Sequence, residues 1–409
     1  MDVLIERGAG IDVHKKLLVV CLLIGQGNRI RKVQKRFGTF KANLIELRDW
    51  LVSEGCTHVV MESTSVYWLP VYEILEGHVS IVVGNAQHIK NVPGRKTDTS
   101  DAEWLAKLLR FGLVRSSYVP PKSLRELRQL TRYRTKATQT LTREKNRVQG
   151  LLETANIKLA SVASDIFGAS GRDMLEALIQ NKSTPEKMAL LARNKMKKKI
   201  PELTLALDGT MNDHHRALLR IQLGLIDKID ASIAEVELAI GHKTAPYAKI
   251  IARLDKIPGI DCTAAVGLLA EMGPDMSVWR SDGHLTAWAG LCPGNHESAG
   301  RKKNIGSRKG NPYLKCLAVQ IATAAVKTNG TYYQAKYQRL AKRRGHKRAI
   351  VAIARMILVT IYHLLTRDTD YKERTAAALK RTDHNSQVRH LTRRFAQIGF
   401  DVALTPISA

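Results

Sequence analysis

Apolar and polar residues alternate with two different periods along the first part of the chain. Residues 9–24 contain two apolar runs separated by a polar turn, which predicts a pair of β-strands. Residues 39–55 instead repeat their apolar positions at helical spacing and end at Gly55, as a helix often does. The same alternation of strand and helix patterns continues to about residue 115. It predicts a layered α/β domain over residues 1–117.

Four further elements are expected inside this domain. Residues 57–64 form a short apolar run that ends in an acid, and residues 78–85 form another run of strand length. Residues 66–77 predict a helix that is interrupted at Pro70. Residues 100–112 predict a second helix, which opens with the acids discussed below.

Longer helical patterns follow the Pro-rich stretch 118–122. Apolar residues recur every three or four positions from residue 123 to about 159, among many Arg and Lys residues, and again over 214–240. Two long amphipathic helices predict an antiparallel coiled coil or a seam between subunits. We therefore predict a coiled-coil connector over 118–249, with a helical insertion at about 160–205.

The last part of the chain is richer in turns. The sequence "IPGI" around Gly259 separates two helical patterns and resembles a helix-hairpin-helix module, whose Gly turn and following helix offer N–H groups to a phosphate. A plain pair of helices packed into a core explains the same residues. We expect a mostly helical domain over 250–366 and a basic, poorly ordered tail over 367–409.

Charge narrows the class of partner. The 409 residues include 65 Lys and Arg against 37 Asp and Glu, which leaves a net charge of +28. Such an excess is typical of proteins that bind a polyanion, and nucleic acid is the first expectation, with an acidic membrane surface as the alternative. No apolar run is expected to span a bilayer. The five cysteines are scattered without a C-x-x-C pair, so we predict neither a zinc site nor disulfides and expect a reducing cytoplasm.

Four acids stand where strands end or a helix begins: Asp12, Glu62, Asp98 and Asp101. An α/β sheet brings strand ends and helix starts to one edge, where four carboxylates would repel one another unless cations neutralised them. Mg²⁺ takes oxygen ligands, and two such ions can activate a nucleophile and stabilise the leaving oxygen of a phosphodiester. The alternative is that Asp98 and Asp101 only cap a helix.

A second group of candidates lies in a basic, Gly-containing loop. Ser298 stands before Ala299 and Gly300, and a serine hydroxyl becomes a nucleophile when its proton is removed and the developing charge is balanced. Ser307 is equally suitable on chemistry alone. Cationic neighbours could hold a scissile phosphate: Arg301, Lys302, Lys303, Arg308 and Lys309. The alternative is a phosphate-binding loop whose serines only donate hydrogen bonds.

The ordered set of motifs resembles a known family. The segments "GIDVHK", "VVMESTSVYWLPVYEIL", "KTDTSDAEWLAKLL", "IPGIDCTAAVGLLAEMG" and "WAGLCPGNHESAGRKKNIGSRKGNPYLK" resemble, in the same order, the DEDD-type insertion-sequence transposases (the IS one-ten family). The resemblance covers about residues 9–366. This chain differs in having Ala299 between Ser298 and Gly300, where the family has Ser-Gly.

The resemblance implies a fold, a reaction and partners. The fold would be α/β plus α: an N-terminal RuvC-like (RNase H-like) domain, a coiled-coil connector and a C-terminal serine transposase domain. Asp12, Glu62, Asp98 and Asp101 would be the catalytic, Mg²⁺-binding acids. Ser298 would be the nucleophile. Nucleic acid would contact the other candidate residues: Gly259, Arg301, Lys302, Lys303, Ser307, Arg308 and Lys309.

The expected partners are donor and target double-stranded DNA and a structured bridge RNA encoded by the element. We also expect homo-oligomers, with dimers assembling to a tetramer, in the nucleoid region of a bacterial or archaeal cytoplasm. Two other functions stay open on the residues alone. One is a Mg²⁺-dependent RuvC-like nuclease that uses water as its nucleophile. The other is a nucleic-acid-binding protein without catalysis.

Overall fold

The computed structural model describes most of the chain: residues 3–26, 29–63, 65–85, 89, 100–181, 183–294, 297–298, 301–302, 310–373, 388–389, 391–397 and 399–403. At 297–298 and 301–302 it describes the backbone alone. The chain divides into two compact units, Met1–Val119 and Pro120–Ala409. The expectation of a poorly ordered tail falls partly on residues 374–387 and 404–409, which lie outside the described residues.

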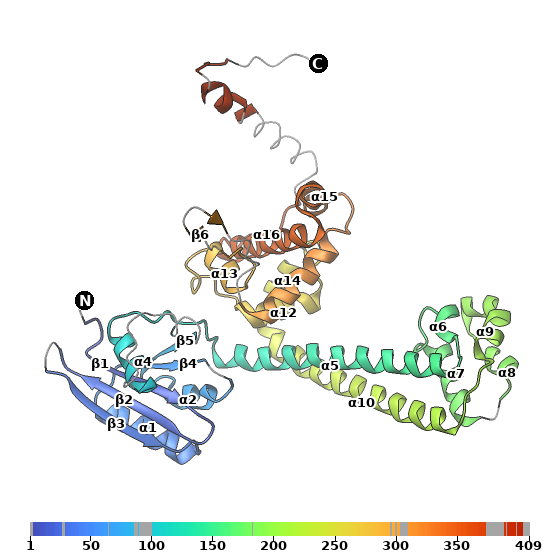
Figure 1. Cartoon of the computed structure of the whole chain (residues 1–409), viewed down its shortest axis with the longest axis horizontal. Helices are drawn as coiled ribbons and strands as arrows, with labels where there is room; N and C mark the ends of the chain where they lie inside the picture. The colour runs from blue at the N-terminus through green and yellow to red at the C-terminus, as the bar shows by residue number, and fades with distance from the viewer. Residues whose placement is uncertain are drawn as a thin grey trace. The chain divides into compact units, whose positions relative to one another are not determined.

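A mixed five-stranded sheet forms the centre of the first unit, in the order β3-β2-β1-β4-β5 (Figure 1). β1 pairs antiparallel with β2, and β1, β4 and β5 run parallel to one another. This confirms the predicted strand pair. The strands are β1 (Arg7–Val13), β2 (Leu18–Ile24), β3 (Arg31–Phe37), β4 (His58–Glu62) and β5 (Ser80–Gly84).

Helices cover both faces of this sheet. Its three described helices are α1 (Lys41–Ser53), α2 (Trp68–Leu75) and α4 (Asp101–Arg110). Leu47 of α1 and Leu75 of α2 are buried in one core with Ile11 of β1. On the other face, Leu105 of α4 is buried with Val60 of β4. Burial on both faces explains why the central strands read as continuous apolar runs.

Two details of this unit differ from the sequence expectation. The predicted interruption at Pro70 was wrong, because α2 begins at Trp68 and Pro70 lies in its first turn. A helix needs no N–H from its first-turn residues, so proline is tolerated there. The sequence reading also missed β3. Its residues are mostly exposed at the sheet edge, so they carry no apolar alternation.

Two long helices dominate part of the second unit: α5 (Lys122–Thr154) and α10 (Asp213–Thr244). They run antiparallel. Lys243 near the end of α10 forms an ion pair of 2.6 Å with Glu126 near the start of α5, while Val148 and Leu219 share a core at the opposite end. The predicted pair of long helices is confirmed, and the coiled coil stays a prediction.

Short helices fill the chain between α5 and α10. They share a buried core with the adjoining ends of the two long helices, through Leu152 and Leu223 among others. The elements are α6 (Leu159–Val162), α7 (Ala169–Gln180), α8 (Pro185–Ala189), the 3₁₀ helix η1 (Asn194–Lys199) and α9 (Ile200–Leu207).

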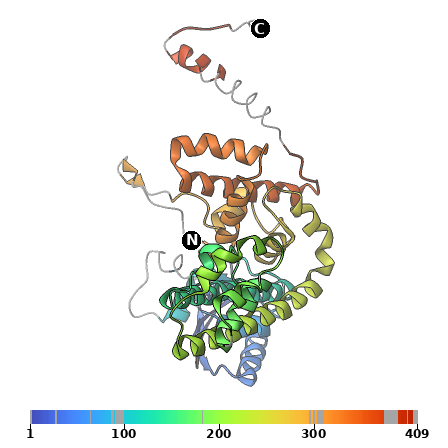
Figure 2. The ribbon, with the colours of Figure 1, turned by 90° about the vertical axis from the view of Figure 1, so that its right-hand side faces the viewer.

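The rest of the second unit is a helical bundle with one small hairpin (Figure 2). α16 packs against α13, α14 and α15, and Ile353, Ile357 and Ile361 on it are fully buried. The elements are η2 (Ala245–Tyr247), α11 (Ala248–Asp255), α12 (Cys262–Met272), α13 (Asp282–Trp288), β6 (Glu297–Ser298), β7 (Arg301–Lys302), α14 (Pro312–Ala325), α15 (Tyr332–Arg344) and α16 (His346–Thr366).

One helix corrects an expectation about apolar runs. Among the described residues, α16 is long and apolar enough to cross a membrane by length and composition, although no such run was expected. Helix packing accounts for part of this composition, because 44% of its most apolar window is buried inside the bundle. The core helix of a globular domain meets the same criterion.

Gly10 lets α4 lie directly on β1. A Cβ at this position would stand 2.1 Å from the carbonyl oxygen of Ala102 and 2.5 Å from the backbone nitrogen of Ala106.

We predict that Gly10→Val destabilises the protein by about 1–3 kcal/mol or more, because α4 would have to move off the sheet. Thermal unfolding followed by circular dichroism measures this. Gly150→Ala is the control, since a Cβ there meets nothing within 4 Å. An unchanged Gly10→Val melting temperature would contradict the packing.

All five cysteines are free, as the sequence suggested. Burial raises the pKa of Cys21 to about 11 and that of Cys56 to about 11, so at pH 8 only about one such thiol in a thousand is the reactive thiolate. Cys262 and Cys316 are exposed.

We predict that a maleimide at pH 8 labels Cys262 and Cys316 in the native protein within minutes, while Cys21 and Cys56 react only after denaturation. Peptide mass spectrometry distinguishes the sites, and rapid native labelling of Cys21 would refute their burial.

Candidate functional site

Strand pairing places two of the predicted acids next to each other. β1 and β4 run parallel with Ile11 opposite Met61, so Asp12 and Glu62 each stand one residue further along neighbouring strands. The carboxyl ends of parallel strands meet at one edge of a sheet, where α/β proteins commonly place their sites. The two acids therefore lie at the same edge.

Successive side chains of a strand point to opposite faces of the sheet, and this alternation places Asp12 and Glu62 on the same face. Ile11 and Met61 point into the core formed with α1 and α2. Their neighbours in sequence, Asp12 and Glu62, therefore belong to the opposite face, which carries α4. Asp12 stands opposite Val19, which packs with Ala102 and Ala106 of α4.

Asp101 reaches this region as the first residue of α4. The helix passes over Gly10 of β1, two residues before Asp12, at backbone contact distance. Ser100 is the N-cap, and its hydroxyl accepts a hydrogen bond of 3.3 Å from the Glu103 backbone N–H. A role as the capping side chain therefore does not account for Asp101. Its charge at the helix start is favourable in any case.

The contacts of these acids leave them accessible to solvent. The Asp12 carboxylate is 27% exposed, and its Oδ2 lies 2.9 Å from Nε2 of His14. Glu62 is half-buried and Asp101 is exposed. Lys107 and Lys32 pair with Glu103, near the start of α4, and hold the pKa of that carboxyl below its usual range. Glu103 is thus already neutralised by the chain itself.

Carboxylate oxygens are the ligands that Mg²⁺ prefers, so the donor chemistry of this edge suits a hard divalent ion. Within the described part of the chain, no group of three or more His, Cys, Asp or Glu side chains is arranged to hold a metal ion. Asp12, Glu62 and Asp101 therefore do not form a complete ligand set by themselves. Asp98, the fourth predicted acid, lies outside the described residues.

The second predicted group is described only in part. Ser298 belongs to β6, which pairs antiparallel with β7 and sets Ser298 opposite Arg301. The structure gives the backbone of these residues and of Lys302. Three more of the predicted residues and the second candidate serine lie outside the described residues: Lys303, Ser307, Arg308 and Lys309.

The chain returns to the described bundle at Gly310. A Cβ there would stand 2.4 Å from the backbone nitrogen of Gly290 and 2.5 Å from the Trp288 carbonyl oxygen. The next residue, Asn311, donates its backbone N–H to the same carbonyl over 2.9 Å. Its side-chain oxygen accepts from the N–H groups of Tyr313 and Leu314 at 3.0 and 3.2 Å and so caps α14.

The two predicted helices on either side of the Gly259 turn are present as α11 and α12. Gly259 adopts the left-handed region with φ +84°. A Cβ at this residue would lie 2.5 Å from backbone atoms of Ile321 and Ala325 in α14. Asp261 caps α12 by accepting from the Ala264 N–H at 2.7 Å. The glycine thus serves helix packing here, and the start of α12 already has a carboxylate.

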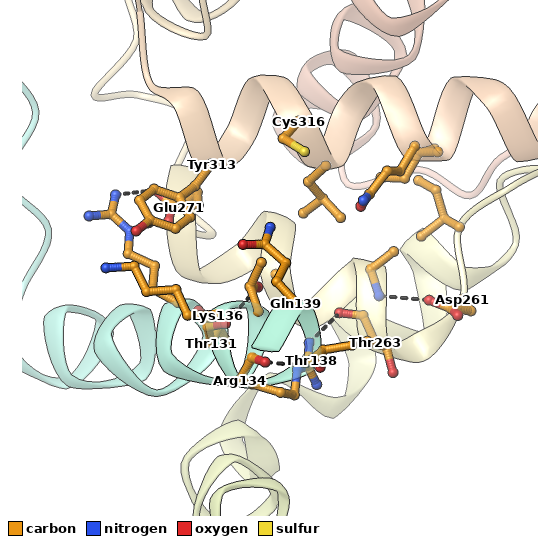
Figure 3. Close-up of a pocket in the computed structure, with 18 of the residues that line it drawn as sticks. Thr131, Arg134, Lys136, Thr138, Gln139, Asp261, Thr263, Glu271, Tyr313 and Cys316 are labelled. Atoms are coloured by element: carbon orange, nitrogen blue, oxygen red, sulfur yellow. Dashed lines mark hydrogen bonds and ion pairs between the residues drawn. The ribbon is translucent and has the colours of Figure 1, made fainter. Parts of the chain in front are cut away.

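A cavity of about 920 Å³ lies between α5, the Gly259 turn with α12, and α14 (Figure 3). This volume is in the range of small-molecule sites. α5 contributes charged and polar groups, including Arg134, Lys136 and Gln139, while α12 and α14 contribute mostly small and apolar residues. Sequence reading missed this cavity, because its walls come from segments far apart in the chain.

Comparisons with known proteins agree with this arrangement of parts. A DEDD-type IS110 transposase model, described as "Transposase", matches residues 9–157, and a model described as "Transposase IS116/IS110/IS902 family" matches residues 251–338. The first match contains the acidic edge. The second contains α12, Ser298 and α14.

Individual relatives carry the same description. The chain is 27% identical over 337 residues to a Pseudomonas aeruginosa protein named "Probable family 20 transposase", covering 80% of this chain and 89% of that protein. It is 22% identical over 370 residues to the "Transposase for insertion sequence element IS1111A" of Coxiella burnetii, covering 89% and 90%. The matched models together span more than half of the chain. This chain belongs to the IS116/IS110/IS902 family of transposases, enzymes that act on DNA.

Proposed function

We propose that this transposase is a bridge-RNA-guided recombinase that cuts and rejoins donor and target DNA through a covalent serine–DNA link. The observation that carries the proposal is the convergence of Asp12, Glu62 and the start of α4 at one sheet edge, in a chain that also has Ser298 among cations. The net charge of +28 supports nucleic-acid partners.

The serine step would balance as follows. Ser298 gives up its hydroxyl proton, and its oxygen bonds to the scissile phosphorus while the DNA 3′-oxygen leaves and takes up a proton. After the strands have exchanged, a 3′-hydroxyl attacks the phosphoserine and releases the serine. The bond energy is retained throughout, so rejoining needs no other energy source.

In this proposal Asp12, Glu62, Asp98 and Asp101 would hold Mg²⁺, which would supply positive charge to polarise the phosphate. The acids would keep that charge at the end of β1 and β4. Nucleic acid would contact the turn at Gly259 and the residues around and after Ser298: Arg301, Lys302, Lys303, Ser307, Arg308 and Lys309. Base pairing by the RNA would supply sequence specificity, while the protein would bind backbone and duplex shape.

The proposal extends to assembly and location. Recombining two duplexes requires several subunits, and the α5–α10 pair would form a coiled-coil seam between dimers that join as a tetramer. The N-terminal α/β fold would be RuvC-like. The enzyme would work at the nucleoid in the cytoplasm of a bacterium or archaeon.

A covalent-trapping experiment tests the nucleophile. Protein, RNA transcribed from the element's flanks, labelled donor and target DNA and Mg²⁺ are incubated together and run on a denaturing gel. We expect a protein–DNA adduct with the unmodified protein and with Ser307→Ala, and none with Ser298→Ala. Cleaved DNA without any adduct, persisting in both variants, would instead indicate a metal nuclease that uses water.

A second experiment tests the acidic edge. We expect Asp101→Asn to lower strand exchange at least about 100-fold, because losing roughly 3 kcal/mol of charge stabilisation corresponds to that factor. The RNA affinity should stay unchanged, and the melting temperature should fall only slightly, because the charge of Asp101 favours its helix start. Asp213→Asn is the matched control, since Asp213 is the first residue of α10 as Asp101 is of α4. Equal activity of the two variants would mean that Asp101 only favours its helix start.

A further inference from the structure

Glu271 is a buried acid in an otherwise apolar helix. It lies near the end of α12, among residues that are all buried, and is itself 3% exposed. A carboxylate in such a place is costly unless it is paired and hydrogen-bonded on both oxygens. Its partners therefore indicate what the acid is there to hold.

One partner comes from α5. The Arg132 guanidinium donates from Nε to Oε1 at 2.7 Å and from Nη2 to Oε2 at 2.8 Å, a two-point contact that fixes the carboxylate plane. Arg128, one turn earlier, donates to the backbone carbonyls of Ala270 and Glu271 at 3.0 and 2.5 Å. Figure 3 labels Glu271 and Tyr313, whose ring lies 4.3 Å from the Arg132 guanidinium.

The Nε atom of Arg128 also lies 3.5 Å from Glu271 Oε2, and a further partner of this carboxylate is Asn311. Its side-chain Nδ2 donates to Glu271 Oε2 over 2.6 Å, while its oxygen caps α14 and its backbone N–H bonds to Trp288. The amide is thus oriented from both ends. Asn311 follows Gly310, the residue at which the described structure resumes after Lys302. Glu271 therefore joins α5 to the first described residues that follow the segment with Ser298, which we call the base of that segment.

We infer that Glu271 is a positioning residue for the serine reaction, which it serves by holding Asn311 against Arg132 of α5. The inference rests on the proposed serine chemistry and adds a function for a buried residue of α12. A displacement of about 1 Å at a reacting group can slow a reaction about 100-fold. The base of the serine segment is where such a displacement would start.

The alternative is that the ion pair only stabilises the core. Glu144 provides a matched comparison, because it is 5% exposed, lies on α5 and pairs with Arg147 at 2.5 Å. Glu144 therefore controls for the loss of a buried carboxylate in this unit. The two acids differ in that Glu271 pairs across helices with Arg132 and Arg128 of α5 and connects to Asn311, whereas Glu144 pairs within one turn of its own helix.

The first measurement uses the protein without nucleic acid. Hydrogen exchange is followed at the amides of Asn311, Tyr313 and Leu314, which are all bonded in the structure. We expect Glu271→Gln to speed their exchange at least about 10-fold and Glu144→Gln to leave it unchanged. Unchanged exchange in Glu271→Gln would overturn the positioning role whatever the reaction proves to be.

The second measurement is the single-turnover rate of the serine–DNA adduct, with DNA affinity measured in parallel. We expect Glu271→Gln to slow adduct formation about 10–100-fold with affinity within about twofold of the unmodified protein. The exchanged pair, Glu271→Gln with Asn311→Asp, again sets a donor against an acceptor between these two side chains and keeps the α14 cap. The new amide nitrogen would also face the Nη2 donor of Arg132, so the exchanged pair should recover only part of the rate. Asn311→Asp alone should be slow.

The outcomes separate the inference from the proposed function. Absence of an adduct with the unmodified protein would count against the serine chemistry and, with it, the catalytic part of the inference. An adduct that forms at the same rate in Glu271→Gln would overturn the inference and leave the serine chemistry standing. Equal slowing by Glu144→Gln, or no recovery in the exchanged pair, would reduce Glu271 to a core ion pair.

Discussion

The acidic edge of the first unit depends on the contact between α4 and β1 at Gly10. Any side chain there would collide with the helix backbone, so hydrogen in place of Cβ sets how closely α4 approaches the sheet. That approach brings the start of the helix, with Asp101, toward the ends of the two strands that carry Asp12 and Glu62. Backbone packing between α4 and β1 thus sets where these acids lie relative to one another.

In the second unit, close packing and a buried charge act on neighbouring residues. Gly310, the first described residue after the segment with Ser298, packs on Gly290, and Asn311 donates a hydrogen bond to Glu271. A buried carboxylate with bidentate and amide partners tolerates little displacement, because moving one partner leaves charge without compensation in a dry interior. Close packing and a buried charge therefore constrain the same short stretch.

The structure shows which charges the chain itself neutralises. Near the start of α4, Lys107 and Lys32 pair with Glu103, and Glu271 of α12 pairs with Arg132 of α5. The effect of the basic residues on a polyanion therefore depends on which of them have acid partners. Arg134 and Lys136 line the cavity of the second unit from α5.

Local patterns in the sequence predicted the order of most elements, because strand and helix periods are properties of neighbouring residues. It predicted the hairpin of β1 and β2, the helix α4 and the long helices α5 and α10, and its motifs identified the family. It missed β3, whose exposed residues carry no period, and it misjudged Pro70, whose effect depends on where the helix begins.

The choice of Asp12, Glu62 and Asp101 also came from local position, at strand ends and a helix start. Only the tertiary structure decided which face those acids share, and only it revealed that Glu271 joins Arg132 to Asn311. Those contacts connect residues far apart in the chain, and their energies come from burial, which no local pattern records.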